Sequence, residues 1–226
     1  MSTLQGVGEV PSTLKRGYQT TMGKPTYLWR KLTATQRQDL MAWRKRRGLP
    51  WHRPPHQANE KARYHLTAAC FEHRHYISYS PERMQSFSAT LLEVFYKRDA
   101  RVHAWCVLPN HYHALIETVG ILGALADLGR MHGRLSFTWN GEEQTRGRQV
   151  WCGAVERYMR NEDHFWATMN YIHNNPVHHG YVQRWQDWPF SSAVDYLAEM
   201  GHDEAARVWR AYPVLDYGKG WDDAAL

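Results

Sequence analysis

Apolar residues change between strand spacing and helix spacing several times in the middle of the sequence, and the order of these changes limits the possible folds. The patterns predict strands at 63–71, 101–108, 111–118 and near 149–158. They predict helices at 80–99, from Gly123 toward Trp139, and at 161–175. The resulting order, β-α-β-β-α-β-α, predicts an α+β fold in which helices cover one antiparallel sheet of ferredoxin-like type.

Cap and turn residues set the expected ends of these elements. Ser80 and Asn161 have side chains that accept hydrogen bonds from the first turn of a helix, so each is expected to be an N-cap. Pro109-Asn110 predicts a tight turn between the second and third strands. Pro176 is expected to end the last helix, because the residue before a proline disfavours the α conformation.

The sequence divides into three predicted regions, and the two outer ones differ in charge. They are an N-terminal extension with a flexible lead-in, a basic helix (33–47) and an arm (1–60), a main domain (61–190), and a C-terminal helix with an acidic tail (191–226). Between Lys24 and Arg63, eleven lysines and arginines face two acids, a balance of +9; from Asp195 onward, seven acids face three bases, a balance of −4. The basic extension is therefore suited to bind phosphate.

Positive charge and flat side chains occur together in the N-terminal extension, a combination that binds backbone phosphates and stacks unpaired bases. The predicted nucleic-acid contacts there are Trp43, Arg44, Lys45, Arg46, Arg47 and Arg53. The alternative is a solvated basic helix. Arg134 and Arg148 are expected to flank a cleft and to contact nucleic acid. The alternative is that Glu142 and Glu143 form ion pairs with these arginines.

The cysteines and the N-terminal residues predict a soluble, cytoplasmic protein. Cys70, Cys106 and Cys152 are odd in number, far apart and without a CxxC pair, so neither a disulfide framework nor a thiolate zinc site is indicated. The first residues lack the apolar core of a signal peptide, and no apolar run is long enough to span a bilayer. A reducing compartment fits this composition.

The triplet His111-Tyr112-His113 lies on the third predicted strand. Side chains two residues apart on a strand share a face, so the two imidazoles lie together and can share a metal ion, while Tyr112 points to the other face. Surface or core histidines are the alternative, because the chain has 14 of them. On the last predicted helix, Tyr171 and Asn175 are one turn apart, so a hydroxyl and an amide oxygen can both approach the pair.

This combination suits transesterification of a phosphodiester. A metal ion held by two imidazoles and one amide keeps open positions for a phosphodiester oxygen, and a nearby tyrosine can act as a nucleophile. The alternative for Tyr171 is a core aromatic residue, since the chain has 13 tyrosines.

Three segments in fixed order resemble a known family. They are AWCVLPNHYHALIET at 104–118, HFWATMNYIHNNPVHHGYV at 164–182 and WQDWPFSSAVDYL at 185–197. They resemble the single-tyrosine HUH transposases, most closely the REP-associated tyrosine transposases. The resemblance extends over residues 60–200 and implies the HUH transposase fold, with 61–190 as the catalytic domain. Tyr112 departs from the usual aliphatic middle residue of the triplet, which leaves the histidine pair intact.

The resemblance also implies roles for the site residues and a reaction. His111 and His113 correspond to the pair that binds Mg²⁺ or Mn²⁺. Asn175 corresponds to the third metal ligand, and Tyr171 to the nucleophile. The implied activity is metal-dependent cleavage and rejoining of single-stranded DNA at or near REP-type palindromic hairpins, through a 5′-phosphotyrosine and a free 3′-OH, as in transposition. The expected partner is therefore hairpin-bearing single-stranded DNA, without a membrane or a nucleotide cofactor, and we favour a monomer over a homodimer.

Two other functions are compatible with the sequence. One is a domesticated DNA-hairpin-binding protein without catalysis. The other is a metal-dependent hydrolase, which needs a general base and usually a third histidine or carboxylate ligand. Glu156 and Asp163 are the candidates for those roles, although their spacing to the histidine pair gives no support.

Overall fold

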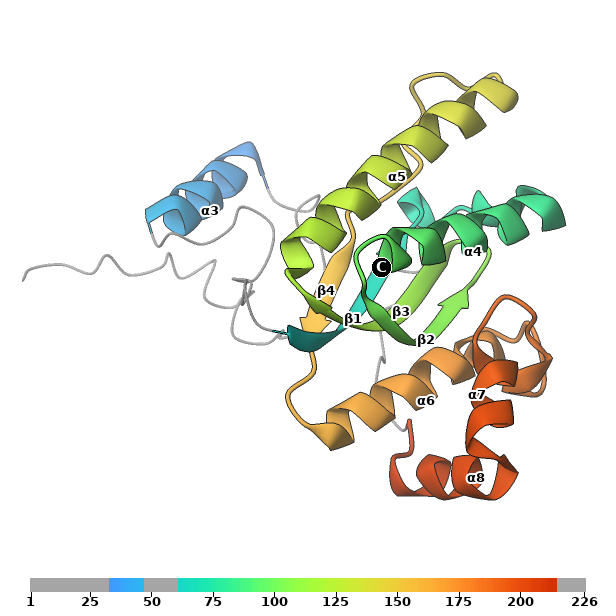
Figure 1. Cartoon of the computed structure of the whole chain (residues 1–226). Helices are drawn as coiled ribbons and strands as arrows, with labels where there is room; N and C mark the ends of the chain where they lie inside the picture. Colours follow the sequence, from blue (N-terminus) through green and yellow to red (C-terminus); the bar gives the residue numbers. More distant parts are fainter. Residues whose placement is uncertain (1–32, 47–60, 215–226) are drawn as a thin grey trace, which may run out of the picture. The chain divides into compact units, whose positions relative to one another are not determined.

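The computed structural model describes residues 33–46 and 61–214, and its main body contains the predicted sheet (Figure 1). The strands are β1 (Lys61–Ala69), β2 (Arg101–Val107), β3 (His111–Val119) and β4 (Val155–Tyr158). The helices of this body are α4 (Pro81–Tyr96), α5 (Ile121–Glu142), α6 (Glu162–His178), α7 (Ala193–Met200) and α8 (His202–Ala211). Single 3-10 turns occur at Phe71–His73, Ile77–Tyr79 and Trp185–Asp187.

The four strands form one antiparallel sheet in the order β2-β3-β1-β4. The order of elements along the chain matches the predicted β-α-β-β-α-β-α, followed by α7 and α8. The α+β fold of ferredoxin-like type is therefore confirmed. The central strands β1 and β3 pair along their whole length, from Lys61 opposite Val119 to Ala69 opposite His111.

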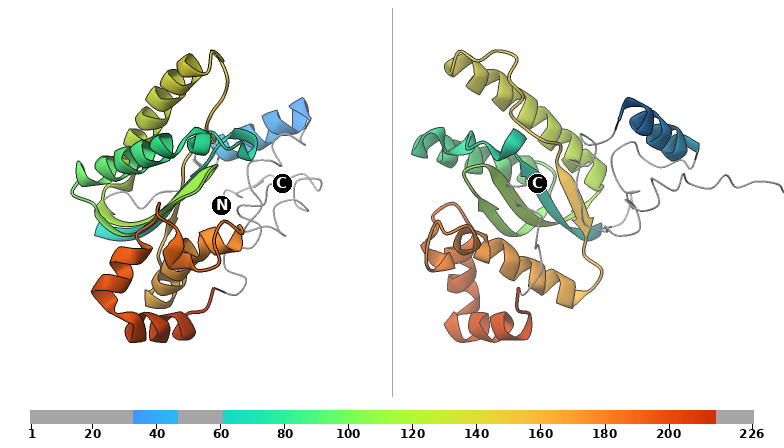
Figure 2. Two further views of the ribbon diagram at one scale, coloured as in Figure 1. Left: turned by 90° about the vertical axis from the view of Figure 1, so that its right-hand side faces the viewer. Right: turned by 180° about the vertical axis from the view of Figure 1, so that it is seen from behind.

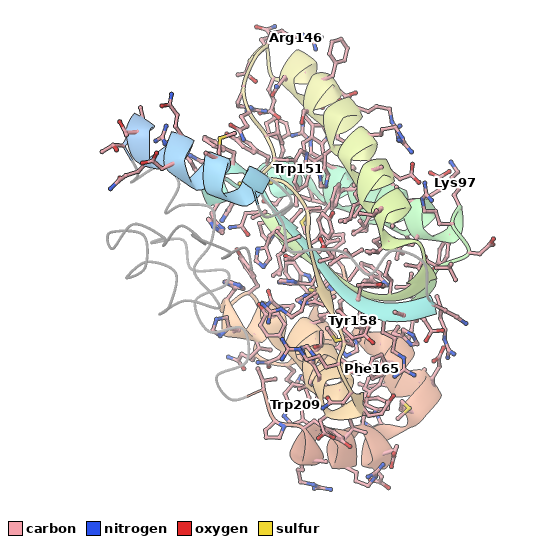
Figure 3. All side chains as sticks on the ribbon, turned by 90° about the vertical axis from the view of Figure 1, so that its left-hand side faces the viewer. Lys97, Arg146, Trp151, Tyr158, Phe165 and Trp209 are labelled. Atoms are coloured by element: carbon pink, nitrogen blue, oxygen red, sulfur yellow. The ribbon has the colours of Figure 1, made fainter. Side chains whose placement is uncertain are left out.

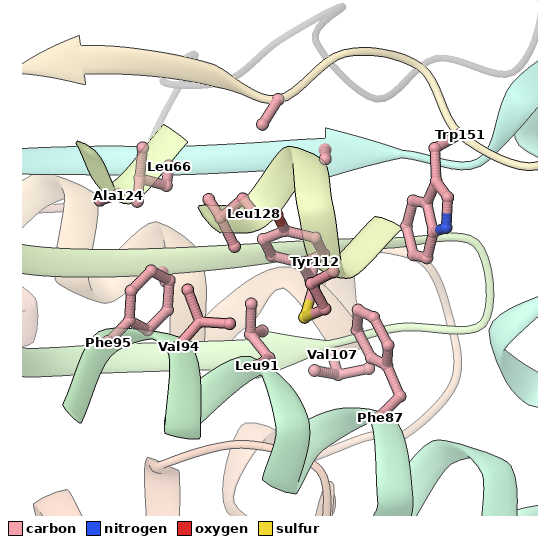
Figure 4. Packing of buried hydrophobic residues seen from close by; sticks show 14 of the residues in the cluster. Leu66, Phe87, Leu91, Val94, Phe95, Val107, Tyr112, Ala124, Leu128 and Trp151 are labelled. Carbon is pink, nitrogen blue, oxygen red and sulfur yellow. The ribbon is translucent and has the colours of Figure 1, made fainter. Parts of the chain in front are cut away.

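The sheet is covered on both faces (Figures 1 and 2). Helices α4 and α5 lie on one face, where the hydrophobic core is formed. Figure 4 shows Leu66 and Tyr112 of the sheet packed against Phe87 and Leu91 of α4 and Leu128 of α5. Helix α6 lies on the other face, over β2 and β3. The face under α6 is the one that carries the polar residues of β3.

Both predicted caps are present. Ser80 accepts a hydrogen bond from Arg83 N at the start of α4, and Asn161 Oδ1 accepts one from His164 N, 2.8 Å away, at the start of α6. The expectation that Pro176 ends the last helix is wrong, because α6 continues to His178. A proline this close to the C-terminus removes only one hydrogen bond of the helix, and His179 N still donates to Asn175 O at 3.0 Å.

The segment after α6 packs on the domain through its aromatic residues and its backbone. Trp188 Nε1 donates to Val107 O at 2.8 Å, and Val107 N donates to Phe190 O at 2.8 Å, so this segment covers the edge of β2. Helices α7 and α8 follow, and α8 lies on the side of α6 that faces away from the sheet (Figure 1). There Asn170 Nδ2 of α6 donates to Tyr212 O at 2.8 Å.

The basic helix predicted at 33–47 is confirmed as α3 (Ala34–Arg46). Thr33 and Gln36 form a reciprocal capping box at its start, with distances of 2.9 and 3.2 Å. Trp43, Arg44, Lys45 and Arg46 lie on this helix, and their side chains are not among those described; Arg47 and Arg53 lie outside the described residues. Over 33–46 and 61–214, no helix has the length and apolar character needed to cross a membrane.

Tyr112 brings a phenol into the core, and His132 of α5 is its partner. A hydrogen bond of 3.2 Å joins Tyr112 Oη to His132 Nε2. The His132 ring also stacks on Trp151, with 4.3 Å between ring centroids. The amphipathic residue in the middle of the triplet is thus accommodated by a second polar residue at the core.

Replacing Tyr112 by Phe should destabilise the protein by about 1–3 kcal/mol, because the buried His132 Nε2 then loses its partner. Urea unfolding monitored by circular dichroism measures this change. The matched control is Tyr96→Phe, since Tyr96 is 62% exposed and should tolerate the loss of its hydroxyl. Equal unfolding free energies for the two variants would contradict the role of this hydrogen bond.

Two buried histidines, His132 and His173, and the half-buried His103 should make stability depend on pH. Burial lowers the pKa of His132 and of His103 to about 4, and that of His173 to about 3. In the unfolded chain a histidine titrates near pH ~6.5, so the unfolded chain binds protons first. This contribution to stability is complete above about pH 6.5 and is lost as the pH falls toward about 4.

Lowering the pH from 7 to 4.5 should therefore reduce the free energy of unfolding by about 2 kcal/mol or more. Urea titrations across that interval measure it. Substitution of His173 by Gln should flatten the pH dependence, whereas substitution of the exposed His202 by Gln should leave it unchanged. A wild-type pH dependence in the His173→Gln variant would argue against this account.

Candidate active site

The alternation of β3 places the two candidate metal ligands under α6. Tyr112 points into the core between the sheet and α4, while His111 and His113 lie on the opposite face of the strand. Their ring centroids are 5.0 Å apart, and their exposed fractions are 1% and 0%. The pair is thus enclosed between the sheet and the layer above it.

Helix α6 presents Tyr171 and Asn175 to this pair from the same face. Asn175 Oδ1 lies 3.0 Å from His111 Nε2, and the Tyr171 ring centroid lies 5.2 Å from that of His113. Residues four apart on a helix share a face, so a single orientation of α6 brings both side chains to the histidines. The structure therefore brings together the four residues that the sequence places in one site.

Three further residues join this cluster that sequence reasoning missed. His65 Nε2 of β1 is 3.0 Å from His113 Nδ1, and Asn110 Oδ1 is 2.7 Å from His111 Nδ1. His179, which caps the C-terminus of α6, has its ring centroid 5.1 Å from that of His111. Each of these residues lies in a predicted strand or in one of the segments that resemble the transposases. Their contacts follow from the pairing of β1 with β3 and from the continuation of α6 past Pro176, which the sequence does not show.

His111 is oriented as a metal ligand. Asn110 Nδ2 donates to His73 O at 3.1 Å, so the Asn110 amide is fixed with Oδ1 toward His111, where it accepts the Nδ1 proton. The neutral ring then has its lone pair on Nε2, facing Asn175 Oδ1. Two acceptors so close repel each other unless a proton or a cation lies between them, and about 3 Å is the spacing of adjacent donors around an octahedral ion with bonds of about 2.1 Å.

The Asn175 amide supplies a second observation that fits a metal ion. Its Nδ2 atom is buried and makes no hydrogen bond with any residue in 33–46 or 61–214. The described residues alone therefore do not fix which atom of the amide faces His111, and the amide can turn its oxygen to a cation or its nitrogen to the ring. The amide oxygen suits Mn²⁺ or Mg²⁺, and imidazole nitrogen is a common ligand of divalent transition-metal ions, so the residues present can hold a divalent ion such as the resemblance implies.

The carboxylates considered for a hydrolase do not join the site. Glu156 is paired with Leu66 across β4 and β1, and residues paired in this way share a face, which here is the core face. Asp163 lies in the first turn of α6, two helical turns before Tyr171. Within the described residues, no three His, Cys, Asp or Glu side chains are placed to hold a metal ion. Among the described residues, the Asn175 amide is the group placed to join the histidine pair as a donor.

Arg134 and Arg148 lie in the α4 and α5 layer, which corrects the expectation that they flank the histidine cleft. Arg134 lines a hollow between α4 and α5, together with Lys97 and Asp127. Arg148 donates to Glu143 at 2.7 Å, as the sequence alternative allowed. Figure 3 shows Lys97 and Arg146 of this region on the other side of the sheet from Phe165 of α6. Contact of Arg134 and Arg148 with DNA stays a prediction.

Comparisons with known proteins bear on the family. No family model matches the chain. A REP-associated tyrosine transposase of Escherichia coli (strain K12) is 27% identical over 116 residues, which make up 48% of this chain and 63% of that protein. A putative REP-associated tyrosine transposase of Haemophilus influenzae is 29% identical over 99 residues, 39% of this chain and 56% of that protein. The chain thus matches less than two thirds of the length of either relative.

A solved structure is similar in fold. It is that of a REP-associated tyrosine transposase bound to a REP hairpin, with a TM-score of 0.50 and 20% identity, covering 64% of this chain and 84% of that chain. The four-stranded antiparallel sheet with its helices is shared between the two. The sequence matches agree with the resemblance found in the sequence, and the solved structure shares the fold: the chain is similar to the REP-associated tyrosine transposases.

Proposed function

We propose that this protein is a metal-dependent enzyme that cleaves and rejoins single-stranded DNA through a covalent bond to Tyr171. The observation that carries the proposal is the convergence of Tyr171 and Asn175 from α6 on His111 and His113 from β3. A tyrosine hydroxyl beside a set of metal donors is the arrangement that phosphodiester transesterification requires. The relatives named as tyrosine transposases support the same chemistry.

The proposed step exchanges one phosphodiester for another. Tyr171 Oη forms a bond to phosphorus as the bond from phosphorus to the 3′ oxygen breaks, which leaves a 5′-phosphotyrosine and a free 3′-OH. The phenol loses its proton and the 3′ oxygen gains one. The reverse attack by a 3′-OH rejoins DNA, and no ATP is consumed because the bond energy is retained in the phosphotyrosine.

His111, His113 and Asn175 would hold the divalent ion, Mg²⁺ or Mn²⁺. When bound, such an ion stabilises negative charge on the phosphodiester oxygens. The protein contributes the positions of the groups, because β3 and α6 are packed elements whose side chains have little freedom. Both the attacking oxygen and the donors come from rigid secondary structure and not from loops.

We propose single-stranded DNA with a REP-like palindromic hairpin as the substrate. The solved relative is described as bound to a REP hairpin, and the net charge of +6 favours a polyanionic partner. The predicted contacts of the N-terminal extension and of Arg134 and Arg148 belong to this proposal. We also propose a monomer, because the donors and the nucleophile converge within one chain, and a cytoplasmic location.

The burial of the site favours a second function, in which the protein binds hairpins without cleaving them. Tyr171 is 3% exposed and Asn175 is 0% exposed. A phosphodiester reaches Tyr171 only after the site opens, so catalysis requires a movement that simple binding does not. Formation of a covalent adduct separates the two functions.

Incubation with hairpin-bearing single-stranded DNA and Mn²⁺ or Mg²⁺ should give a covalent protein–DNA adduct that survives denaturing electrophoresis. Substitution of Tyr171 by Phe should abolish the adduct while DNA affinity stays within about twofold of wild type, because phosphate contacts elsewhere supply most of the binding. The matched control is Tyr96→Phe, at an exposed position on α4.

If the Tyr171→Phe variant cleaves DNA to the same extent as the wild type, the proposed mechanism is wrong. Binding without cleavage by the wild type, under all metal conditions, would instead establish the second function.

Mn²⁺ affinity tests the metal donors independently of DNA. Isothermal titration should show that Asn175→Ala weakens Mn²⁺ binding about tenfold or more, because the site then loses its only amide donor. Asn174→Ala is the control, since Asn174 is the preceding residue of α6 and is not placed toward His111. The same affinity for both variants would show that Asn175 is not a ligand.

A further inference from the structure

Each candidate metal histidine has a polar partner at its Nδ1 atom. For His111 the partner is Asn110 Oδ1, 2.7 Å away. For His113 it is His65 Nε2, 3.0 Å away. The two partners come from different places, Asn110 from the turn before β3 and His65 from the neighbouring strand β1. The same atom of each ring is therefore engaged by the protein in two independent ways.

The partner of His111 is itself held in place. Asn110 Nδ2 donates to His73 O, and Asn110 O accepts from Cys70 N at 2.7 Å. The amide therefore cannot turn without losing a hydrogen bond, and it presents an acceptor to His111 Nδ1. Only the tautomer with a proton on Nδ1 satisfies this acceptor, and that tautomer places the lone pair of His111 on Nε2.

His65 is placed to do the same for His113. It is 2% exposed and lies on the α6 face of β1, where Thr67 pairs with His113 and His65 pairs with Leu115. In a hydrogen bond between two imidazoles one nitrogen donates and the other accepts. When His113 Nδ1 donates to the lone pair of His65 Nε2, the lone pair of His113 lies on Nε2, as in His111.

His65 also contacts the candidate nucleophile. Its ring centroid lies 6.0 Å from that of Tyr171, with the two rings in an edge-to-face arrangement. The Tyr171 ring in turn lies beside His113. His65 therefore packs against His113 and against Tyr171 at once. We expect a change at this position to alter the orientation of the His113 ring more than the fold of the sheet.

We propose that His65 and Asn110 are positioning residues that fix His113 and His111 as Nδ1-protonated rings, so that both present Nε2 to one divalent ion. The inference rests on the proposed metal site. Hydrogen bonds from the remote nitrogen of a ligating imidazole commonly set its tautomer and orientation, and their loss weakens metal binding by about 10–100-fold. His65 packs on the Tyr171 ring, but in this account neither residue contacts the substrate or Tyr171 Oη.

The first test uses the metal-free protein and nuclear magnetic resonance of ¹⁵N-labelled histidine, which distinguishes the two neutral tautomers. At neutral pH, the wild type should show His111 and His113 protonated on Nδ1. A His113 ring protonated on Nε2 would overturn the proposal for His65 without any variant being made. A His111 ring protonated on Nε2 would do the same for Asn110.

The second test compares substitutions that keep or remove the acceptor. His65→Gln can place an amide oxygen where Nε2 lies and should keep the tautomer of His113 and the Mn²⁺ affinity within about threefold of wild type. His65→Leu should lose the single tautomer and weaken Mn²⁺ binding about tenfold or more. Asn110→Leu removes the acceptor of His111 and should have the corresponding effect on that ring, measured against the wild type. Equal tautomers and affinities in the two His65 variants, or in Asn110→Leu and the wild type, would overturn the role of that residue.

Two controls separate this inference from other effects. His103→Gln changes a histidine on the same sheet face, where its ring packs on Phe165, and should leave Mn²⁺ affinity unchanged. Thermal unfolding of each variant shows whether it is folded; if His65→Leu is not, His65→Asn, whose amide is too short to reach the Nε2 position, replaces it. If the variants show the expected tautomers and Mn²⁺ affinities but the wild type does not cleave DNA, the roles of His65 and Asn110 are supported and the proposed function is rejected.

Discussion

The alternation of side chains along β3 is the constraint on which the rest of the structure depends. Because neighbouring residues of a strand point to opposite faces, Tyr112 enters the core while His111 and His113 face α6. A shift of one residue in the pairing of β3 with β1 would exchange the two faces and place both imidazoles among apolar side chains. The core that holds Tyr112 therefore also fixes the position of the histidine pair.

The sequence predicts the features that depend on local periodicity or on a local hydrogen bond. These are the order of elements, the caps at Ser80 and Asn161, and the shared face of Tyr171 and Asn175. The neighbours of the site were not. His65 is an ordinary strand residue until β1 is known to pair with β3, and that pairing is a long-range property of the sheet. The error at Pro176 has a related cause, since packing of α6 on the sheet outweighs the local preference of one residue.

The site combines rigid placement with burial. Its donors lie on packed elements and form hydrogen bonds to neighbours, which favours a fixed geometry over one assembled by the substrate. The same packing leaves Tyr171 and Asn175 almost without exposure, so the proposed reaction requires a movement that admits DNA to the site. The hydrogen bonds at Nδ1 of His111 and His113 provide a way to keep the donors oriented during such movement.

The most direct measurement of the central claim is the identity of the residue that becomes attached to DNA. The protein is incubated with hairpin-bearing single-stranded DNA and Mn²⁺, digested with nuclease and protease, and mapped by tandem mass spectrometry. The account predicts a nucleotide joined through its 5′-phosphate to Tyr171. Attachment at any other residue, or cleaved DNA without any attached nucleotide, would contradict it.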